Sequence, residues 1–105
     1  MQYHVTKPHG SNLRKGRVSL PHHVYLVTAV TLARQPVFLS FENARMAIRS
    51  LHDPDMVRQA RTLAYVVMPD HLHWLLQLED RGNLSEVVRL YKAKVSLQLG
   101  QSWQR

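Results

Sequence analysis

Two histidines separated by one residue, His71 and His73, are the side chains whose types and spacing best suit chemistry in this 105-residue chain. Successive side chains of a β-strand point to opposite faces, so in a strand both imidazoles would project from the same face. Imidazole binds zinc and many transition metals, and with oxygen ligands it also holds manganese or magnesium. The pair therefore predicts half of a divalent-metal site. Histidines beside a turn are commonly solvated, and the spacing alone leaves that alternative open.

The residues around the pair predict a β-hairpin with both histidines at the head of its second strand. The apolar run Tyr65–Met68 precedes the turn signal Pro69-Asp70, and the apolar pattern resumes at Trp74. The other histidines lack ligand spacing, and we interpret each as a surface residue: His4, His9, His22, His23 and His52. The chain contains no cysteine, which excludes disulfides and thiolate sites.

The elements that must position the pair follow the order β-α-β-β-α. We expect strands over 23–32, 62–68 and 71–78, a helix capped by Ser40 that runs to Leu51, and a helix over 84–99 that ends at Gly100. This order predicts one domain with an α+β, ferredoxin-like sandwich, in which two helices cover one face of an antiparallel sheet. The fourth strand of that fold would begin at Trp103 and Gln104 and is incomplete.

Periodicity assigns side chains to the two faces of this sandwich. The buried stripe of the first helix is predicted to comprise Phe41, Ala44, Ala47, Ile48 and Leu51. Along the 71–78 strand, the side chains expected to face the helices are Leu72, Trp74, Leu76 and Leu78. His71, His73 and Gln77 would then lie on the open face of the sheet.

The charge of the chain predicts a polyanionic partner. Fourteen Lys and Arg residues face seven Asp and Glu residues, which gives a formal net charge of +7 and a pI near 10.4. Such an excess attracts phosphate backbones, although composition alone leaves DNA, RNA and an anionic membrane surface open. No apolar segment is long enough to span a membrane and the N-terminus lacks the order of a signal peptide, so we expect a soluble cytoplasmic protein.

The basic residues gather in an N-terminal arm over 1–20 and on the predicted helices. The residues that we expect to contact phosphates are Arg14, Lys15, Arg17, Arg89 and Lys92. Any one basic pair is more commonly a solvated face. Several basic elements beside a possible metal site nevertheless favour a track for a nucleic-acid backbone.

The chain resembles the HUH-class tyrosine transposases, and most closely the REP-associated tyrosine transposases of bacteria. The segments that carry the resemblance are Leu13–Arg17, Val24–Thr28, Tyr65–Trp74, the helix over 87–97 with Lys92, and Trp103-Gln104. The block Tyr65–Trp74 is the most specific of them. The resemblance implies a transposase domain over 1–105 that binds single-stranded or hairpin DNA in the bacterial cytoplasm, associated with the nucleoid and without a membrane partner.

The resemblance also implies metal-assisted cleavage of single-stranded DNA beside an imperfect hairpin. His71 and His73 would hold Mg²⁺ or Mn²⁺ at the scissile phosphate, and a tyrosine oxygen would attack it to leave a 5′-phosphotyrosine and a free 3′-hydroxyl. In the family this tyrosine lies on a helix that follows the Trp-Gln strand. That helix has no counterpart up to Arg105, so we expect a shortened domain that binds metal and DNA without its own nucleophile.

Tyr91 is the fallback nucleophile, and its position argues against that role. It lies near the centre of a continuous apolar stripe made by Leu84, Val87, Val88, Tyr91, Val95 and Leu99. In the family that the chain resembles, a polar residue four positions after the tyrosine completes the metal shell, but here that position is Val95, which cannot bind a metal. We interpret Tyr91 as a core or rim aromatic, Tyr3 as part of a tail, and Tyr25 and Tyr65 as mid-strand residues.

The sequence leaves other functions open beside the shortened transposase domain. A complete nicking enzyme would use Tyr91 or a tyrosine of another chain. A non-catalytic ferredoxin-like module would instead stack nucleic-acid bases on aromatic residues of its sheet, but the predicted open face offers histidines and Gln77 in place of an aromatic platform. An uncovered sheet edge would also invite pairing with another chain, which makes a homodimer possible.

Overall fold

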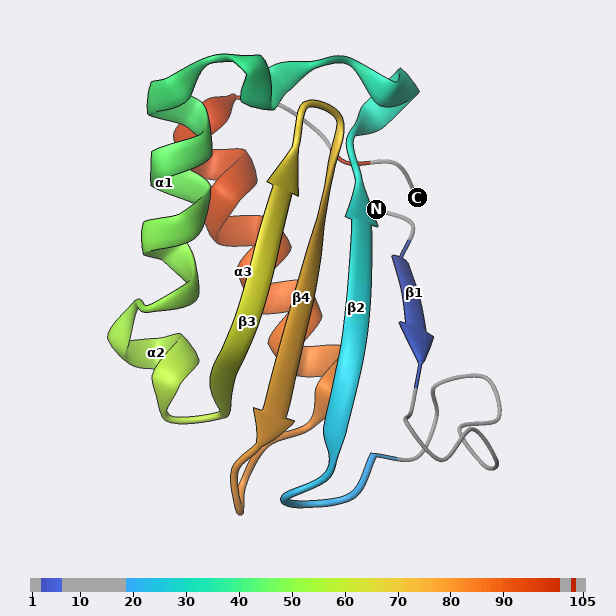
Figure 1. Cartoon of the computed structure of the whole chain (residues 1–105). Coiled ribbons are helices and arrows are strands. Elements are labelled where there is room, and N and C mark those ends of the chain that lie inside the picture. The colour runs from blue at the N-terminus through green and yellow to red at the C-terminus, as the bar shows by residue number, and fades with distance from the viewer. Residues whose placement is uncertain (1–2, 7–18, 101–102, 104–105) are drawn as a thin grey trace.

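A four-stranded antiparallel sheet with its helices on one face forms the protein (Figure 1). The computed structural model describes residues 3–6, 19–100 and 103. The elements are β1 (Tyr3–Thr6), β2 (Val24–Val30), α1 (Phe41–Leu51), α2 (Pro54–Val57), β3 (Ala60–Met68), β4 (His71–Leu78) and α3 (Leu84–Leu99), with single 3-10 turns at Leu32–Arg34 and Val37–Leu39. The strand order is β1-β2-β4-β3, so β2 and β4 lie in the middle of the sheet. This arrangement confirms the predicted α+β sandwich.

Local capping signals set the ends of the two long helices. The Ser40 hydroxyl accepts a hydrogen bond from the Asn43 amide at the start of α1, and the Asn83 side chain does the same for the Glu86 amide at the start of α3. Gly100 ends α3 with a φ of 66°, a left-handed conformation that favours glycine. Within the described residues, no helix is long and apolar enough to cross a membrane.

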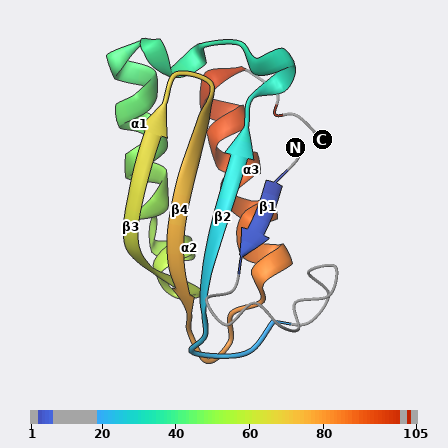
Figure 2. The same cartoon turned by 45° about the vertical axis from the view of Figure 1, so that its right-hand side comes forward.

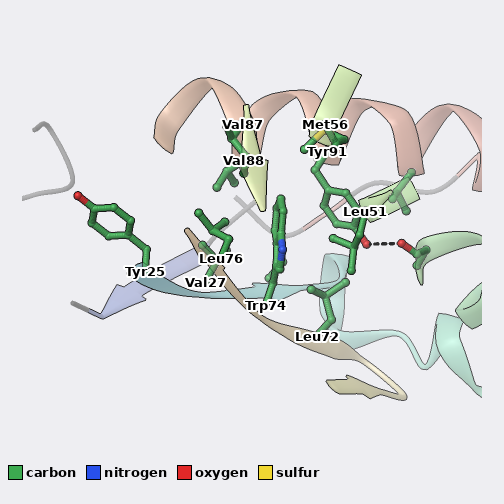
Figure 3. Packing of buried hydrophobic residues seen from close by; sticks show 14 of the residues in the cluster. Tyr25, Val27, Leu51, Met56, Leu72, Trp74, Leu76, Val87, Val88 and Tyr91 are labelled. Atoms are coloured by element: carbon green, nitrogen blue, oxygen red, sulfur yellow. Dashed lines mark hydrogen bonds between the residues drawn. The ribbon is translucent and has the colours of Figure 1, made fainter. Parts of the chain in front are cut away.

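The core lies between the sheet and the helices (Figure 3). Leu72, Trp74, Leu76 and Leu78 are each no more than 1% exposed, which confirms that they face the helices. The ring of Trp74 packs against that of Tyr91 with 5.1 Å between ring centroids. Tyr91 also donates a hydrogen bond to the Ala47 carbonyl at 2.9 Å and so joins α3 to α1. Its assignment as a core aromatic is confirmed.

Some expectations about the helical layer and the N-terminus are wrong. Phe41 is 74% exposed, because α1 turns Ala47, Ser50 and Leu51 toward the core and leaves its first residue outside. The sequence predicts a stop signal for α1 at residues His52 to Asp55, but the short helix α2 begins within them at Pro54, with its first turn capped by the Asp53 carboxylate. Tyr3 does not belong to a tail, because it begins β1.

The fourth strand of the sheet comes from the N-terminus. β1 pairs antiparallel with β2, with Tyr3 opposite Ala29, and the turned view shows it lying along the β2 edge (Figure 2). The predicted C-terminal strand is represented by a single antiparallel bridge between Trp103 and Thr31, at the end of β2. Gln104 lies outside the described residues.

Residues 31–39 cross the end of the β3–β4 hairpin and are tied to its turn (Figure 1). The Thr31 amide and hydroxyl both donate to the Asp70 carbonyl, at 2.9 and 3.0 Å. The Phe38 amide donates to the Pro69 carbonyl at 3.0 Å. The turn that precedes His71 is therefore held from outside the hairpin.

Candidate metal and DNA site

His71 and His73 lie on the face of the sheet opposite the helices, at the start of β4. They alternate with the buried residues Leu72 and Trp74, and both histidines are partly exposed. Their rings lie 5.0 Å apart between centroids, with an angle of 81° between the ring planes. Strand alternation thus brings the two imidazoles together, as the spacing predicts.

The imidazole of His71 is oriented by the residue before it. Its Nδ1 lies 2.6 Å from Oδ1 of Asp70. A carboxylate can only accept a hydrogen bond, so Nδ1 carries the proton and the lone pair is left on Nε2. The hydrogen bond from His71, together with the charge of Arg34, holds the pKa of the Asp70 carboxyl below its ordinary value.

The imidazole of His73 is oriented from the neighbouring strand. Its Nδ1 lies 2.9 Å from the hydroxyl of Thr28, which is its register partner on β2. The hydroxyl oxygen can accept a hydrogen bond from Nδ1–H, an arrangement that also leaves the lone pair on Nε2. Each histidine therefore has one nitrogen fixed by the protein, as metal-binding histidines ordinarily do.

These features fit two ligands of a divalent-metal site. Paired imidazoles on one face, each with a hydrogen-bonded Nδ1, form the arrangement that presents Nε2 to an ion. In the part of the chain that the structure describes, no group of three or more His, Cys, Asp or Glu residues could hold a metal. Oxygens of water or of a phosphate, which Mg²⁺ and Mn²⁺ accept, could supply further ligands.

An apolar hollow of about 320 Å³ adjoins His73 on the open face of the sheet. The residues that line it are Leu26, Ala64, Tyr65, Val66, His73 and Leu75. Val66, the register partner of His73 on β3, is 54% exposed. The histidine pair therefore lies at the margin of an apolar surface that runs across β2, β4 and β3.

The predicted phosphate-contacting residues are not gathered beside this pair. Arg89 and Lys92 belong to α3, which covers the opposite face of the sheet, and Arg89 forms an ion pair with Glu86 at 2.6 Å. The Lys92 carbonyl accepts a hydrogen bond from the Trp103 indole at 3.2 Å. Arg14, Lys15 and Arg17 lie outside the described residues.

Sequence reasoning missed one basic residue near the histidines. Nε of Arg34 donates to Oδ2 of Asp70 at 3.1 Å, while the other oxygen of that carboxylate contacts His71. The two partners are 36 residues apart in the chain, and no local pattern signals their contact. Arg34 is thus the basic side chain that the fold joins to the histidine pair.

Of the tyrosines whose side chains are described, Tyr25 and Tyr91 are buried and Tyr65 borders the hollow beside His73. Tyr25 is 1% exposed and its hydroxyl accepts a hydrogen bond from the Leu20 amide. Tyr65 is the register partner of the core residue Trp74, and Tyr91 is 1% exposed. Burial raises the pKa of the Tyr91 phenol above its ordinary value, which opposes formation of a nucleophilic phenolate.

Comparison with known proteins places the chain in a family. A family model described as IS200-like transposase matches residues 20–105. A solved structure of a REP-associated tyrosine transposase bound to a REP hairpin is 22% identical, with a TM-score of 0.62, and the match covers 84% of this chain and 55% of that one. The chain thus spans about half the length of that protein, and the likeness concerns the fold. No curated protein matches. Because the family model covers most of the chain, the protein belongs to the IS200-like transposase family.

Proposed function

We propose that the protein is a DNA-binding transposase domain that recognises single-stranded or hairpin DNA and holds Mg²⁺ or Mn²⁺ between His71 and His73. The observation that carries this proposal is the fixing of both Nδ1 atoms, by Asp70 and by Thr28, on one open face of the sheet. Family membership and the fold shared with a hairpin-bound transposase support it. The net charge of +7 suits a phosphate backbone as partner.

The residues of the site would each have a defined part in phosphodiester chemistry. His71 and His73 would hold the ion, and Asp70 and Thr28 would keep the imidazoles in the required tautomer and orientation. A bound divalent ion supplies positive charge that stabilises the negative charge developing on the phosphoryl oxygens. The predicted contacts from Arg14, Lys15 and Arg17 would position the backbone, and those from Arg89 and Lys92 would engage backbone that reaches α3 on the opposite face of the sheet.

None of the tyrosines whose side chains are described would be the nucleophile of such a reaction. Tyr25 and Tyr91 are buried, and Tyr65 borders the hollow but is the register partner of Trp74, whose side chain faces the helices. A tyrosine attacking a phosphate at the histidine pair would have to approach from the open face. We therefore propose that the described fold binds metal and DNA, and that cleavage needs a tyrosine supplied by a further segment or by another chain.

A stacking module without metal dependence is the second candidate, and the open face favours it less. Next to His73, the hollow is lined mainly by aliphatic residues of the strands, including Leu26, Val66 and Leu75, and Tyr65 is its one aromatic residue besides the histidine. Base stacking on a sheet of this type uses exposed aromatic rings on the strands. Dependence of DNA binding on a divalent ion separates the two candidates, because stacking does not need the ion.

Titration with Mn²⁺ followed by a DNA-binding measurement tests the proposal. We expect the wild-type chain to bind Mn²⁺ in calorimetry and to bind a labelled single-stranded hairpin more tightly in its presence. His71→Ala and His73→Ala should abolish both effects. His52→Ala is the matched control, because His52 lies at the end of α1, where its Nδ1 contacts the Ile48 carbonyl and its ring packs edge-on against Tyr65. Equal loss in all three variants, or no Mn²⁺ binding by the wild type, would contradict the metal site.

A denaturing gel of the same mixtures tests the source of the nucleophile. A covalent DNA adduct that disappears in both His71→Ala and Tyr91→Phe would identify Tyr91 as the nucleophile and overturn its assignment to the core. We expect no Tyr91-dependent adduct, because the Tyr91 hydroxyl is buried and bonded to Ala47.

Assembly and location complete the proposal. We propose that any homodimer forms through β3, an edge strand of nine residues with the exposed apolar side chains Leu63, Tyr65, Val66 and Met68. Sedimentation equilibrium with wild type and Leu63→Lys tests this, since added charge at the edge should weaken association.

We also propose that the protein is found in the bacterial cytoplasm, associated with the nucleoid. Fluorescence microscopy of a tagged chain tests this by comparing its distribution with that of stained DNA.

A further inference from the structure

The segment that presents Arg34 is held in an uncommon backbone conformation. Ala33 and Arg34 have backbone φ angles of 53° and 52°. Residues other than glycine rarely adopt this left-handed region. The segment is fixed on both sides, because the buried Thr31 hydroxyl donates to the carbonyls of Gln35 and Asp70. Strained backbone that is kept in place by specific contacts is characteristic of functional segments.

The contact with Asp70 uses only part of the Arg34 guanidinium. Nε donates to the carboxylate, and the side chain stays 61% exposed. Asp70 is the polar partner that the structure records for this side chain. An exposed ion pair contributes little to folding stability, so stabilisation of the loop is a weak reason for this geometry. The two Nη groups remain as donors in the planar fork that suits a phosphate.

With a divalent ion on the histidines, the balance of charge at this corner would favour an anion. The carboxylate of Asp70 lies between the Arg34 guanidinium and His71, so one negative charge faces a permanent cation and an imidazole. A divalent ion on the histidines would leave an excess of positive charge. A phosphodiester carries one negative charge and would relieve that excess.

We propose that Arg34 is a phosphate-contacting residue, aimed by Asp70 so that its Nη groups and an ion on the histidine pair engage the same stretch of DNA backbone. The inference rests on the proposed function. It assigns Asp70 two positioning tasks, because one carboxylate oxygen orients His71 and the other orients Arg34. The metal and the arginine would then bind DNA cooperatively, since each places the phosphate for the other.

Coupling between the ion and Arg34 is the measurable consequence. The dissociation constant of a labelled single-stranded hairpin is measured with and without Mn²⁺ at fixed ionic strength, and the ratio gives the Mn²⁺-dependent gain. Mn²⁺ binding without DNA is measured separately by calorimetry. Arg34→Gln removes the guanidinium, whereas Arg34→Lys keeps the charge and removes the fork.

Arg58→Gln is the matched control for this experiment. Arg58 is also an exposed arginine, 72% accessible, and is ion-paired with Asp55. It follows α2, at the end of β3 remote from the hairpin turn (Figure 1). Arg58→Gln lowers the net charge of the protein by the same amount as Arg34→Gln, but at a place remote from the histidine pair.

We expect both Arg34 variants to reduce the Mn²⁺-dependent gain about fivefold or more, as for coupled sites, while Mn²⁺ affinity without DNA stays at the wild-type value. The control should leave the gain unchanged. An equal Mn²⁺-dependent gain in Arg34→Gln and Arg58→Gln would overturn this inference but not the proposed function. Weaker Mn²⁺ binding by Arg34→Gln without DNA would also overturn it, because the substitution would then act through His71 and not through the DNA. A wild-type chain without any gain would overturn the proposed function and the inference together.

Discussion

At the scale of single residues, the site depends on which nitrogen of each imidazole the protein occupies. Asp70 and Thr28 both contact Nδ1, although one precedes His71 in the chain and the other lies on a neighbouring strand. Both contacts use Nδ1, so Nε2 is the nitrogen that each ring keeps for a metal ion. Positioning residues of this kind commonly change metal affinity by 10- to 100-fold when they are removed.

Thr28→Val tests the positioning of His73. Valine keeps the β-branched shape that suits a strand but cannot accept the hydrogen bond from His73, so the imidazole loses its orientation. We expect affinity for Mn²⁺ to fall about tenfold, measured by calorimetry, with the far-UV circular dichroism spectrum unchanged.

Thr62→Val is the matched control for that variant. The Thr62 hydroxyl accepts a hydrogen bond from the Trp74 indole at 2.9 Å, on the helix side of the sheet. Its loss leaves a buried indole N–H without its acceptor and should lower the free energy of unfolding by about 1–3 kcal/mol, without an effect on Mn²⁺ affinity. Equal Mn²⁺ affinity in Thr28→Val and the wild type would show that Thr28 does not position His73.

At the scale of elements, an ionic contact joins α2 to α3 on the side of the molecule away from the site. Nζ of Lys94 lies 3.2 Å from Asp53 and 3.3 Å from Asp55. Asp53 also caps α2 by accepting a hydrogen bond from the Asp55 amide. These contacts fasten the short helix to the long one and close the end of the core.

Asp53→Asn tests this contact through its dependence on pH. The hydrogen bond from the Asp55 amide, followed by the contact with Lys94, lowers the pKa of Asp53 in the folded protein. Its stabilising contribution is therefore present above the unfolded pKa, about 3.9, and is lost as the pH falls through the lower folded pKa. We expect the wild type to exceed the variant in urea midpoint at pH 7, and the difference to shrink in acid.

Glu42→Gln changes the net charge by the same amount in the first turn of α1 and serves as the control. Urea midpoints are compared at intervals from neutral pH down to about pH 2, well below the pKa of an unfolded aspartate. A difference between wild type and Asp53→Asn that stayed constant over this range would refute the contribution of the Asp53 charge.

At the scale of the whole molecule, the excess of basic residues should make DNA binding strongly dependent on salt. Counterion release from single strands gives a slope of log affinity against log salt of about −0.7 per phosphate contact. If Arg14, Lys15, Arg17, Arg89 and Lys92 all contact phosphates, affinity should fall about 100-fold between 50 and 200 mM salt. Fluorescence anisotropy over a salt series measures the slope.

The contribution of the basic arm follows from a triple variant. Replacing Arg14, Lys15 and Arg17 by glutamine should reduce the magnitude of the slope by about 2. The control variant replaces Arg45, Arg49 and Arg58 by glutamine, which removes the same charge from the region of α1 and α2. This variant should change the slope less. Equal changes in the two triple variants would mean that the arm contributes only its net charge.

The sequence by itself determined the elements whose signals are local. Alternation of apolar and polar side chains predicted β4 over 71–78 and placed both histidines on its open face. Gly100 likewise predicted the end of α3 after residue 99, because a C-terminal cap acts within one turn of the chain. Residue spacing therefore predicted the histidine pair of the candidate site, although not the residues that orient it.

Only the tertiary structure decided the contacts that orient this pair. Thr28 lies 45 residues from His73, and Arg34 lies 36 residues from Asp70. Each contact depends on strand register or on how residues 31–39 cross the hairpin, and neither is encoded by a local periodicity. The pairing of Tyr3–Thr6 with β2 and the exposure of Phe41 have the same origin, because they are set by how whole elements pack against each other.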